Sequence, residues 1–251
     1  MPVFDSHLHI IDPRFPLVEN QGYLPDNFLV ADYLKQVSGL SIQSGVVVSG
    51  SFQVFDQTYL VESLRQLNLN GDNFVGVTQL PVSVSDEEIL SLDNQGVRAL
   101  RFNLRRGGSE SVVELESMAK RVYELVNWHV ELYIGFDALS ELADVIGKLP
   151  SASIDHLGLE KRSLPFLKDL VSAGVKVKAT GFGRLDFDFL PTITVLHAIN
   201  PDALMFGTDL PSTRAPKPFE ITHLSLLKES LDESTYKKIT WQNGRSFYRL
   251  D

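Results

Sequence analysis

Two histidines separated by a single residue, His7 and His9, are the first groups in the chain whose types and spacing suggest chemistry. They lie near the end of a short, mainly apolar run, residues 3–10, which predicts a β-strand. Side chains alternate along a strand, so both imidazoles point to the same side, about 6–7 Å apart. Such a pair can converge on a metal ion or on one substrate oxygen. The alternative is a hydrogen-bonded pair within a core.

Two further groups of this kind end similar runs later in the chain. His156 is near the end of the run at residues 152–157, and Asp209 ends the run at residues 204–209. Imidazoles and carboxylates are common general acids and bases, and both bind divalent ions. Each residue alone could be a capping or turn residue. Four such groups at equivalent positions predict an active site.

Bringing these groups together requires a fold in which the ends of distant strands meet. Strand-like runs and longer amphipathic stretches alternate through the whole sequence. Apolar residues spaced by three and four predict helices at residues 111–127, 137–148 and 165–173, and a closing helical pair at 219–231 and 233–248. The eight predicted strands are residues 3–10, 45–52, 74–80, 97–104, 130–135, 152–157, 175–180 and 204–209.

Eight strands with helical crossovers in 251 residues predict a single (β/α)8 barrel, a TIM barrel, over residues 1–251. An open doubly wound sheet would normally carry a glycine-rich turn after its first strand, where this chain has HLHIIDP at residues 7–13. In a barrel the first and eighth strands are neighbours, so Asp209 should face His7 and His9. Catalytic groups gather at the C-terminal ends of barrel strands. Residues 211–218 are expected to form a loop over this mouth.

The composition restricts the class of protein. A net charge of −9 argues against nucleic acid as a partner, because phosphate binding needs a concentrated basic face. The absence of cysteine excludes disulfides and thiolate chemistry, so any metal must be held by His, Asp or Glu. No secretory signal is visible, and no apolar run approaches the ~20 residues that span a bilayer. We therefore expect a cytoplasmic enzyme with no membrane partner; the sequence does not indicate an oligomeric state.

Several motifs resemble the amidohydrolase superfamily (amidohydrolase-related family 2), in the branch that includes the 2-pyrone-4,6-dicarboxylate lactonases. They are FDSHLH at residues 4–9, IDHLG at 154–158 and GTDLP at 207–211. The run VRALRFN at 97–103, the run ELYI at 131–134 and the pair Lys178 and Arg184 are similar to further strands of that branch. The resemblance extends over essentially the whole chain.

The resemblance implies a hydrolase that opens a carboxylated lactone by attack of water. Asp209 would deprotonate the water as general base. His7, His9 and His156 would polarise the carbonyl group and stabilise the developing oxyanion. An amidohydrolase of this branch would therefore use all four of the groups that the sequence places at one end of the barrel.

The arginines favour a small anionic, carboxylated substrate, because a guanidinium binds a carboxylate through two parallel hydrogen bonds. Arg101, one of Arg105 and Arg106, and Arg184 should lie near the mouth, and the resemblance favours Arg106. Leu159 stands where the branch places an arginine, which implies a different set of substrate contacts. Three further positions match substrate-binding residues of the branch: Ser51, Tyr23 and Tyr133.

Metal dependence is the main alternative. Metal-dependent members usually carry a histidine near the end of strand five, where this chain has Tyr133, and no lysine is evident on strand four. The branch that the chain resembles works without a required metal, so we expect no obligatory cofactor. A single divalent ion, Zn or Mn, held by His7, His9 and Asp209 would instead indicate a mononuclear metal-dependent amidohydrolase or decarboxylase.

A third hypothesis is a non-catalytic barrel that binds carboxylates. The intact set of His7, His9, His156 and Asp209 argues against this hypothesis, because a binding protein needs no general base.

Overall fold

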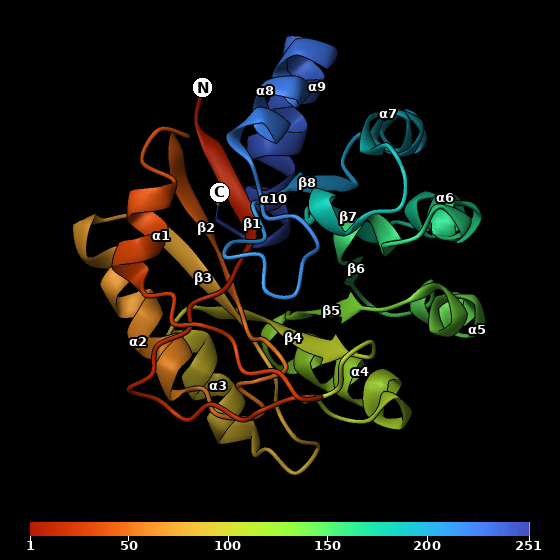
Figure 1. Ribbon diagram of the computed structural model, residues 1–251. Coiled ribbons are helices and arrows are strands. Elements are labelled where there is room, and N and C mark those ends of the chain that lie inside the picture. Colours follow the sequence, from red (N-terminus) through yellow and green to blue (C-terminus); the bar gives the residue numbers. More distant parts are fainter. Residues whose placement is uncertain (251) are drawn as a thin grey trace.

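The structure, a computed structural model, describes residues 1–250; Asp251, the last residue of the predicted domain, lies outside them. Within the described chain eight parallel strands form one sheet in which each strand pairs with the next in sequence (Figure 1). This order is that of a (β/α)8 barrel, so the predicted fold is confirmed. The strands are β1 (Val3–Leu8), β2 (Ile42–Val48), β3 (Asn73–Thr78), β4 (Val97–Asn103), β5 (His129–Tyr133), β6 (Ala152–Ile154), β7 (Lys176–Ala179) and β8 (Leu204–Phe206).

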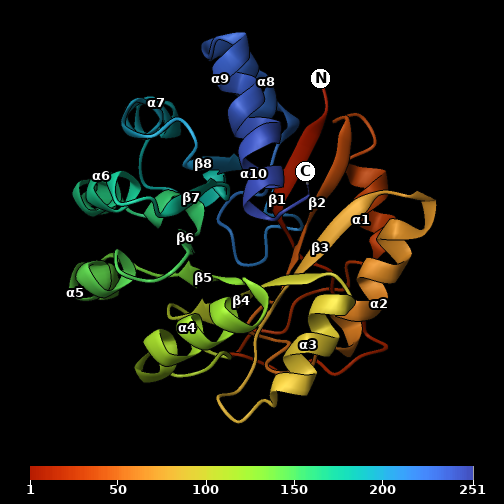
Figure 2. The same cartoon turned by 180° about the vertical axis from the view of Figure 1, so that it is seen from behind.

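Helices surround the sheet, and Figure 2 shows the C-terminal α10 close to β1. The longer predicted helices are all present within one to four residues of their predicted bounds, except that residues 233–248 form α9, a π-helical turn and α10 in succession. The helices are α1 (Val30–Gln36), α2 (Thr58–Leu67), α3 (Asp86–Asn94), α4 (Leu115–Val126), α5 (Phe136–Ile146), α6 (Leu164–Ser172), α7 (Phe189–Ile199), α8 (Ile221–Ser230), α9 (Glu233–Lys237) and α10 (Asn243–Phe247). In the part of the chain that the structure describes, none of them is long and apolar enough to cross a membrane.

Every strand ends one to four residues earlier than the sequence predicts, and β2 begins at Ile42 rather than at residue 45. The predicted runs continue beyond the ladders into a mixture of polar and apolar residues, so the sequence pattern overestimates the strands. The extra residues belong to the loops that follow each strand at the C-terminal end of the barrel. His9, Ser51 and Asp209 therefore stand on loop backbone one to three residues after a strand, and His156 begins a 3-10 turn two residues after β6.

The barrel closes between β1 and β8 through few backbone contacts. Leu8 and Leu210 form an isolated parallel bridge, and the amide of Asp209 donates to the carbonyl of His7 at 2.7 Å. A glycine at position 207 permits this approach, because a Cβ there would stand 2.7 Å from the backbone nitrogen of His7. The seam places Asp209 beside the histidine pair, as predicted from barrel closure.

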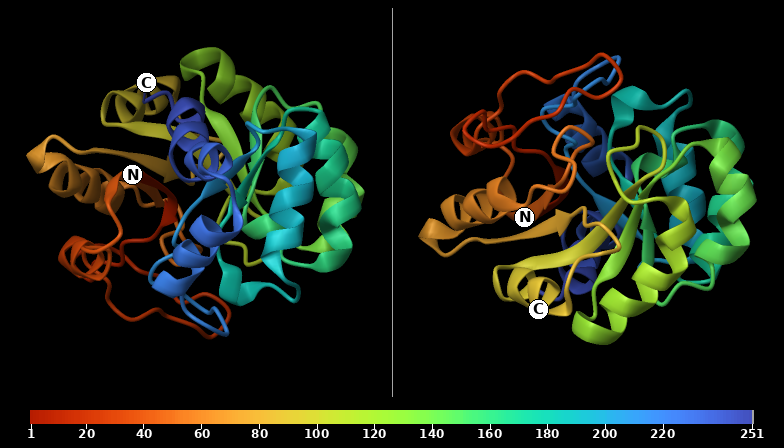
Figure 3. Two further views of the ribbon diagram at one scale, coloured as in Figure 1. Left: turned by 90° about the horizontal axis from the view of Figure 1, so that it is seen from above. Right: turned by 90° about the horizontal axis from the view of Figure 1, so that it is seen from below.

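Two long loops lie at the same end of the molecule as the strand C-termini. Residues 9–29 follow β1, and residues 207–220 follow β8. Both views in Figure 3 show these two loops side by side, far from the C-terminus. Asn20 and Arg214 join them through hydrogen bonds.

Candidate active site

Three histidines and one carboxylate converge at the mouth of the barrel. Nε2 of His7, His9 and His156 lies 3.9, 3.8 and 3.9 Å, respectively, from one oxygen, Oδ1 of Asp209. All four side chains are buried. The structure thus brings together the four residues that the sequence singled out as catalytic candidates.

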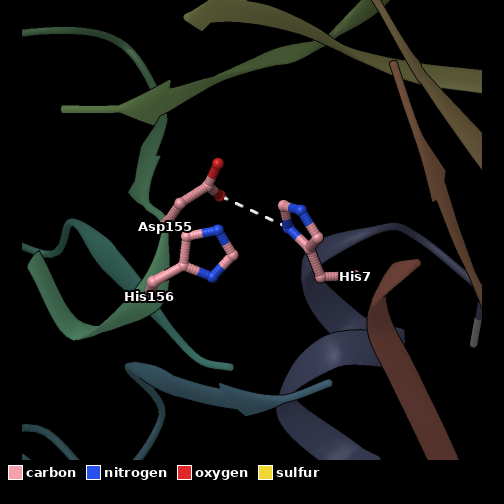
Figure 4. A group of neighbouring side chains, drawn as sticks. All are labelled: His7, Asp155 and His156. Carbon is pink, nitrogen blue, oxygen red and sulfur yellow. Dashed lines mark ion pairs between the residues drawn. The ribbon is translucent and has the colours of Figure 1, made fainter. Parts of the chain in front are cut away.

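Asp155 is a fifth member of this group that the sequence analysis did not single out. Its Oδ1 lies 3.6 Å from Nδ1 of His7, and Figure 4 shows the two groups facing each other with His156 alongside. The ring centroids of His7 and His156 are 4.8 Å apart. The signal in the sequence for Asp155 was a carboxylate beside a histidine at the end of a predicted strand.

The backbone at two of these residues is in the left-handed region, with φ of 52° at His156 and 61° at Asp209. Residues other than glycine rarely adopt it, and it costs about 1–3 kcal/mol where the surroundings impose it. Close packing fixes the imidazole: a Cβ on Gly181 would stand 2.6 Å from Nδ1 of His156. Position 181 therefore requires glycine, and strain of this kind is typical of functional sites.

The contacts of the Nδ1 atoms determine what each Nε2 atom can do. Nδ1 of His9 lies 2.7 Å from the carbonyl oxygen of Val48, which only accepts, so Nδ1 carries the proton and Nε2 a lone pair. Nδ1 of His7 lies 3.5 Å from Nζ of Lys178, a donor, which favours the proton on Nε2, and 3.6 Å from Oδ1 of Asp155, an acceptor, which favours it on Nδ1. His9 therefore presents a lone pair at Nε2, and His7 presents an N–H group there when its Nδ1 accepts from Lys178.

Burial is the largest influence on the protonation of these groups. It lowers the pKa of His9 to about 3, and it lowers the pKa of both His7 and His156 well below 6.5. All three rings are therefore neutral at neutral pH. Burial raises the pKa of Asp209 above 3.8, and Arg184, whose Nε donates to Oδ2 at 2.6 Å, opposes this rise.

Oδ1 of Asp209 and Nε2 of His7 are buried and have no hydrogen-bond partner within the described residues. Atoms of this kind are rare and call for a ligand, a water molecule or an ion. The ligating atoms of His7, His9 and Asp209 all lie within 4.8 Å of one another, as do those of His7, Asp155 and His156. Zinc bonds of about 2.0–2.2 Å need ligand atoms only a little closer than this, so the first set fits a single divalent ion.

Arg101 and Arg184, predicted as substrate clamps, are already paired with carboxylates of the protein. Arg101 donates to Asp155 at 2.8 Å and to the carbonyl of Ser49 at 2.6 Å. Arg184 donates to Asp209 and to the carbonyl of residue 213. Each of these two guanidinium groups therefore donates one hydrogen bond to a carboxylate, which it orients, and one to a backbone carbonyl.

A cavity opens above this cluster. Seven of the predicted site residues line it: His9, Ser51, Arg101, Arg106, Tyr133, His156 and Arg184. Its other lining residues, which the sequence analysis did not single out, are Gly50, Phe52, Asn103, Thr213 and Arg214.

Four other candidate residues, His7, Asp209, Tyr23 and Arg105, are not among the residues that line this cavity. Tyr23 lies at its edge, where its ring packs under the guanidinium of Arg214 at 4.5 Å. Arg105, the alternative to Arg106, is exposed and lies 3.6 Å from Glu160. The structure therefore resolves the choice between the two neighbouring arginines in favour of Arg106 as the cavity residue.

A second buried network supports His7. Nζ of Lys178 lies 2.5 Å from Oε2 of Glu131, and the hydroxyl of Tyr248 donates to Oε1 of the same carboxylate. His129 contacts Oε1 as well, at 3.2 Å. The sequence analysis noted Lys178 only through the resemblance and missed Glu131 and Tyr248. For Glu131, the signal in the sequence was a charged residue inside an otherwise apolar strand.

Comparison with proteins of known sequence identifies the family to which this chain is similar. The family model described as amidohydrolase matches residues 4–250. A 4-sulfomuconolactone hydrolase of Rhizobium radiobacter is 28% identical over 227 residues, which cover 83% of this chain and 75% of that protein. A 2-pyrone-4,6-dicarboxylate hydrolase of Comamonas testosteroni is 30% identical over 236 residues, which cover 82% of this chain and 76% of that protein.

Solved structures show the same fold. A probable 2-pyrone-4,6-dicarboxylic acid hydrolase of Acinetobacter baumannii, with citric acid bound, superimposes with a TM-score of 0.80 at 20% identity, over 99% of this chain and 100% of that one. A protein of Agrobacterium tumefaciens superimposes with a TM-score of 0.85 at 18% identity, over 99% and 96%. From the family match and the relative at 30% identity it follows that this chain belongs to the amidohydrolase family.

Proposed function

We propose that this protein hydrolyses a small lactone that carries an anionic group. The observation that carries the proposal is the unpartnered oxygen Oδ1 of Asp209, with three imidazole nitrogens 3.8–3.9 Å away, beneath an arginine-lined cavity. A buried carboxylate with one free oxygen is suited to accept a proton from water. The names of the relatives, hydrolases of 4-sulfomuconolactone and of 2-pyrone-4,6-dicarboxylate, support an anionic lactone as the substrate class.

The attack on the lactone would use the opposite protonation of the two histidines of the pair. A water molecule between Asp209 and His9 can donate one hydrogen to Oδ1 and the other to the lone pair of Nε2, since these atoms are 3.8 Å apart. Oδ1 takes a proton as the water oxygen bonds to the carbonyl carbon. The N–H group of His7 stabilises the oxyanion. His156, whose Nδ1 contacts the hydroxyl of Thr180 at 2.8 Å, can do the same.

Ring opening would complete the reaction without a covalent intermediate. The bond between the carbonyl carbon and the ring oxygen breaks, and the proton held by Asp209 passes to the leaving oxygen. Water is added across the ester, and the new carboxylic acid loses its proton to solvent. Arg184 holds Oδ2 and so keeps Oδ1 directed at the water.

This assignment refines the hypothesis that all three histidines polarise the carbonyl. In the neutral state His9 offers a lone pair towards the carboxylate, so its role is to orient water or to ligate a cation.

A metal-dependent reaction at the same site is the second candidate, favoured by the fit of three ligating groups. His7, His9 and Asp209 would hold a single divalent ion such as Zn or Mn. When bound, the ion would polarise the carbonyl group and lower the pKa of its water. The roles of the cavity arginines would be unchanged.

A hydrolysis screen tests the proposal. The panel contains 2-pyrone-4,6-dicarboxylate, lactones with one carboxylate or sulfonate, and uncharged lactones, followed by acid release in weak buffer with and without chelator. We expect turnover of anionic lactones, which Asp209→Asn should reduce by about 10²–10⁴-fold. Asp144→Asn, the same change at an exposed carboxylate of α5, is the matched control and should retain full activity.

Three results would contradict parts of this proposal. Full activity of Asp209→Asn would reject the general base. Loss of activity with chelator and its recovery with one equivalent of metal would select the metal-dependent reaction. Tight binding of the panel without turnover would reject catalysis and support a carboxylate-binding barrel.

A further inference from the structure

The four arginines that line the cavity fall into two pairs with different electrostatic surroundings. Arg101 and Arg184 form ion pairs with buried carboxylates at 2.8 and 2.6 Å. Arg106 and Arg214 form no ion pair with any carboxylate of the described chain. The uncompensated positive charge of the cavity therefore belongs to Arg106 and Arg214, here called the outer pair.

The outer pair is directed at one point. NH1 of Arg106 and NH1 of Arg214 each lie 3.5 Å from Oε1 of Gln21. A neutral amide oxygen from an exposed side chain thus stands between two guanidinium groups. Burial, and next the charge of Arg106, lower the pKa of Arg214, as expected when like charges approach without an anion.

The guanidinium of Arg214 and the backbone of Arg106 are held in place before any ligand binds. The guanidinium of Arg214 packs over the ring of Tyr23 at 4.5 Å and donates to the backbone carbonyl and the side chain of Asn20. The side-chain amide of Asn20 in turn donates to the carbonyl of Arg106 at 3.1 Å. The loop after β1 therefore fixes the loops after β4 and β8 against each other, where Figure 3 shows the first and last side by side. A preorganised side chain such as that of Arg214 loses less conformational entropy on binding than a free one.

We propose that Arg106 and Arg214 together bind an anionic group of the substrate, a carboxylate or sulfonate remote from the ester that is hydrolysed, in the position of Oε1 of Gln21. The identity of the ligand as a substrate rests on the proposed function; the anion site itself does not. Two planar guanidinium groups can share the oxygens of one such anion. The anion would displace the exposed side chain of Gln21, whose amide donates to the carbonyl of Arg106 at 3.2 Å. Arg214 is thereby a specificity-determining residue.

Calorimetric titration with isophthalate, a planar dicarboxylate that cannot be hydrolysed, tests the site without turnover. Loss of one charge-assisted pair of hydrogen bonds should weaken binding about 10- to 100-fold in Arg214→Gln and in Arg106→Gln. Arg214→Lys, which keeps the charge but not the fork, should weaken it less. Arg105→Gln, an exposed neighbour outside the cavity, is the matched control and should bind as the unmodified protein does. Melting temperatures verify that each variant is folded.

Kinetics separate this inference from the proposed function. For 2-pyrone-4,6-dicarboxylate, Arg214→Gln should lower kcat/KM mainly through KM, whereas turnover of uncharged 2-pyrone should change less than twofold. If lactones are hydrolysed but Arg214→Gln alters neither binding nor KM, the anion site is refuted while the activity stands. If no lactone is hydrolysed but isophthalate binding depends on Arg214, the activity fails and the site stands. Failure of the unmodified protein to bind isophthalate would also overturn the site.

Discussion

Replacing Asp5 by asparagine should change how the stability of the protein depends on pH. Asp5 is buried in β1 and accepts four hydrogen bonds: from the amides of His7 and Thr208, and from the hydroxyls of Thr208 and Tyr33. Burial outweighs these bonds and raises its pKa from 3.8 to about 6. At neutral pH the group is ionised, but between these two values the folded protein holds the proton more tightly than the unfolded chain does.

The sign and size of the effect follow from this difference in pKa. The folded protein gains stability because it binds the proton on Asp5 more tightly than the unfolded chain does. This contribution to the free energy of unfolding is fully present below pH 3.8 and is lost as the pH rises through 6. A difference of about 2.2 units, from 3.8 to 6, corresponds to roughly 3 kcal/mol in full. Of this, about 1.4 kcal/mol changes between about pH 5 and about pH 7.5. Asparagine does not titrate, so the stability advantage of the unmodified protein over Asp5→Asn should be larger by that amount at the lower pH.

Urea unfolding of both proteins at the two pH values measures this quantity, and other titrating groups cancel in the difference. Tyr33→Phe removes one donor and keeps the carboxylate, so its pH dependence should be steeper than that of the unmodified protein. A difference between unmodified protein and Asp5→Asn that stays constant with pH would refute the reasoning. A larger advantage at the higher pH would show that the four donors hold the pKa below 3.8.

Three further predictions concern the site and its support. Arg184→Gln removes the cation beside Asp209 and should move the acidic limb of the kcat/KM profile upward by about 1–3 pH units, in a pH series on an anionic lactone. Tyr248→Phe leaves Oε1 of Glu131 without its hydroxyl donor and should lower the free energy of unfolding by about 1–2 kcal/mol in urea titrations. Extensive chelation should leave turnover unchanged if water is activated by protein groups alone; stoichiometric metal that disappears in His9→Ala would contradict this.

The barrel could be predicted from the sequence because its signal is repeated. Eight apolar runs alternate with amphipathic stretches, and the start of each run agrees with its strand to within three residues. The ends could not be predicted, because most residues that follow the strands stay buried while their backbone leaves the ladder. Asp209, with φ of 61°, shows why: the turn that directs its carboxylate has no hydropathy signature.

The positions of the candidate catalytic groups could be predicted because parallel strands place their C-terminal ends together. The roles of individual ring nitrogens could not. Whether His9 presents an N–H or a lone pair depends on the carbonyl of Val48, a residue of the neighbouring strand that happens to lie opposite Nδ1. Partners of this kind are set by the tertiary contact between strands, and residue types alone do not encode them.

The arginines also show that residue types alone do not encode the contacts of a side chain. The residue type led to the prediction of an anionic substrate, but it gave no means of distinguishing Arg101, which is paired with Asp155, from Arg106, which is not. Arg214 was overlooked because a loop arginine is ordinarily solvated. Its position in the cavity depends on the stacking contact with Tyr23, nearly two hundred residues away in the chain.

Two buried aspartates at the β1–β8 seam show which feature distinguishes a structural carboxylate from one that can take part in a reaction. Asp5 receives four hydrogen bonds on its two oxygens, so it has little capacity left to accept a proton from a substrate. Asp209 receives the guanidinium of Arg184 on Oδ2, while Oδ1 has no donor within the described residues. Burial raises the pKa of both, so the pKa does not discriminate between them. The oxygen without a donor distinguishes them, because only Asp209 has one. This oxygen faces the three imidazoles, and the proposed chemistry is therefore assigned to Asp209.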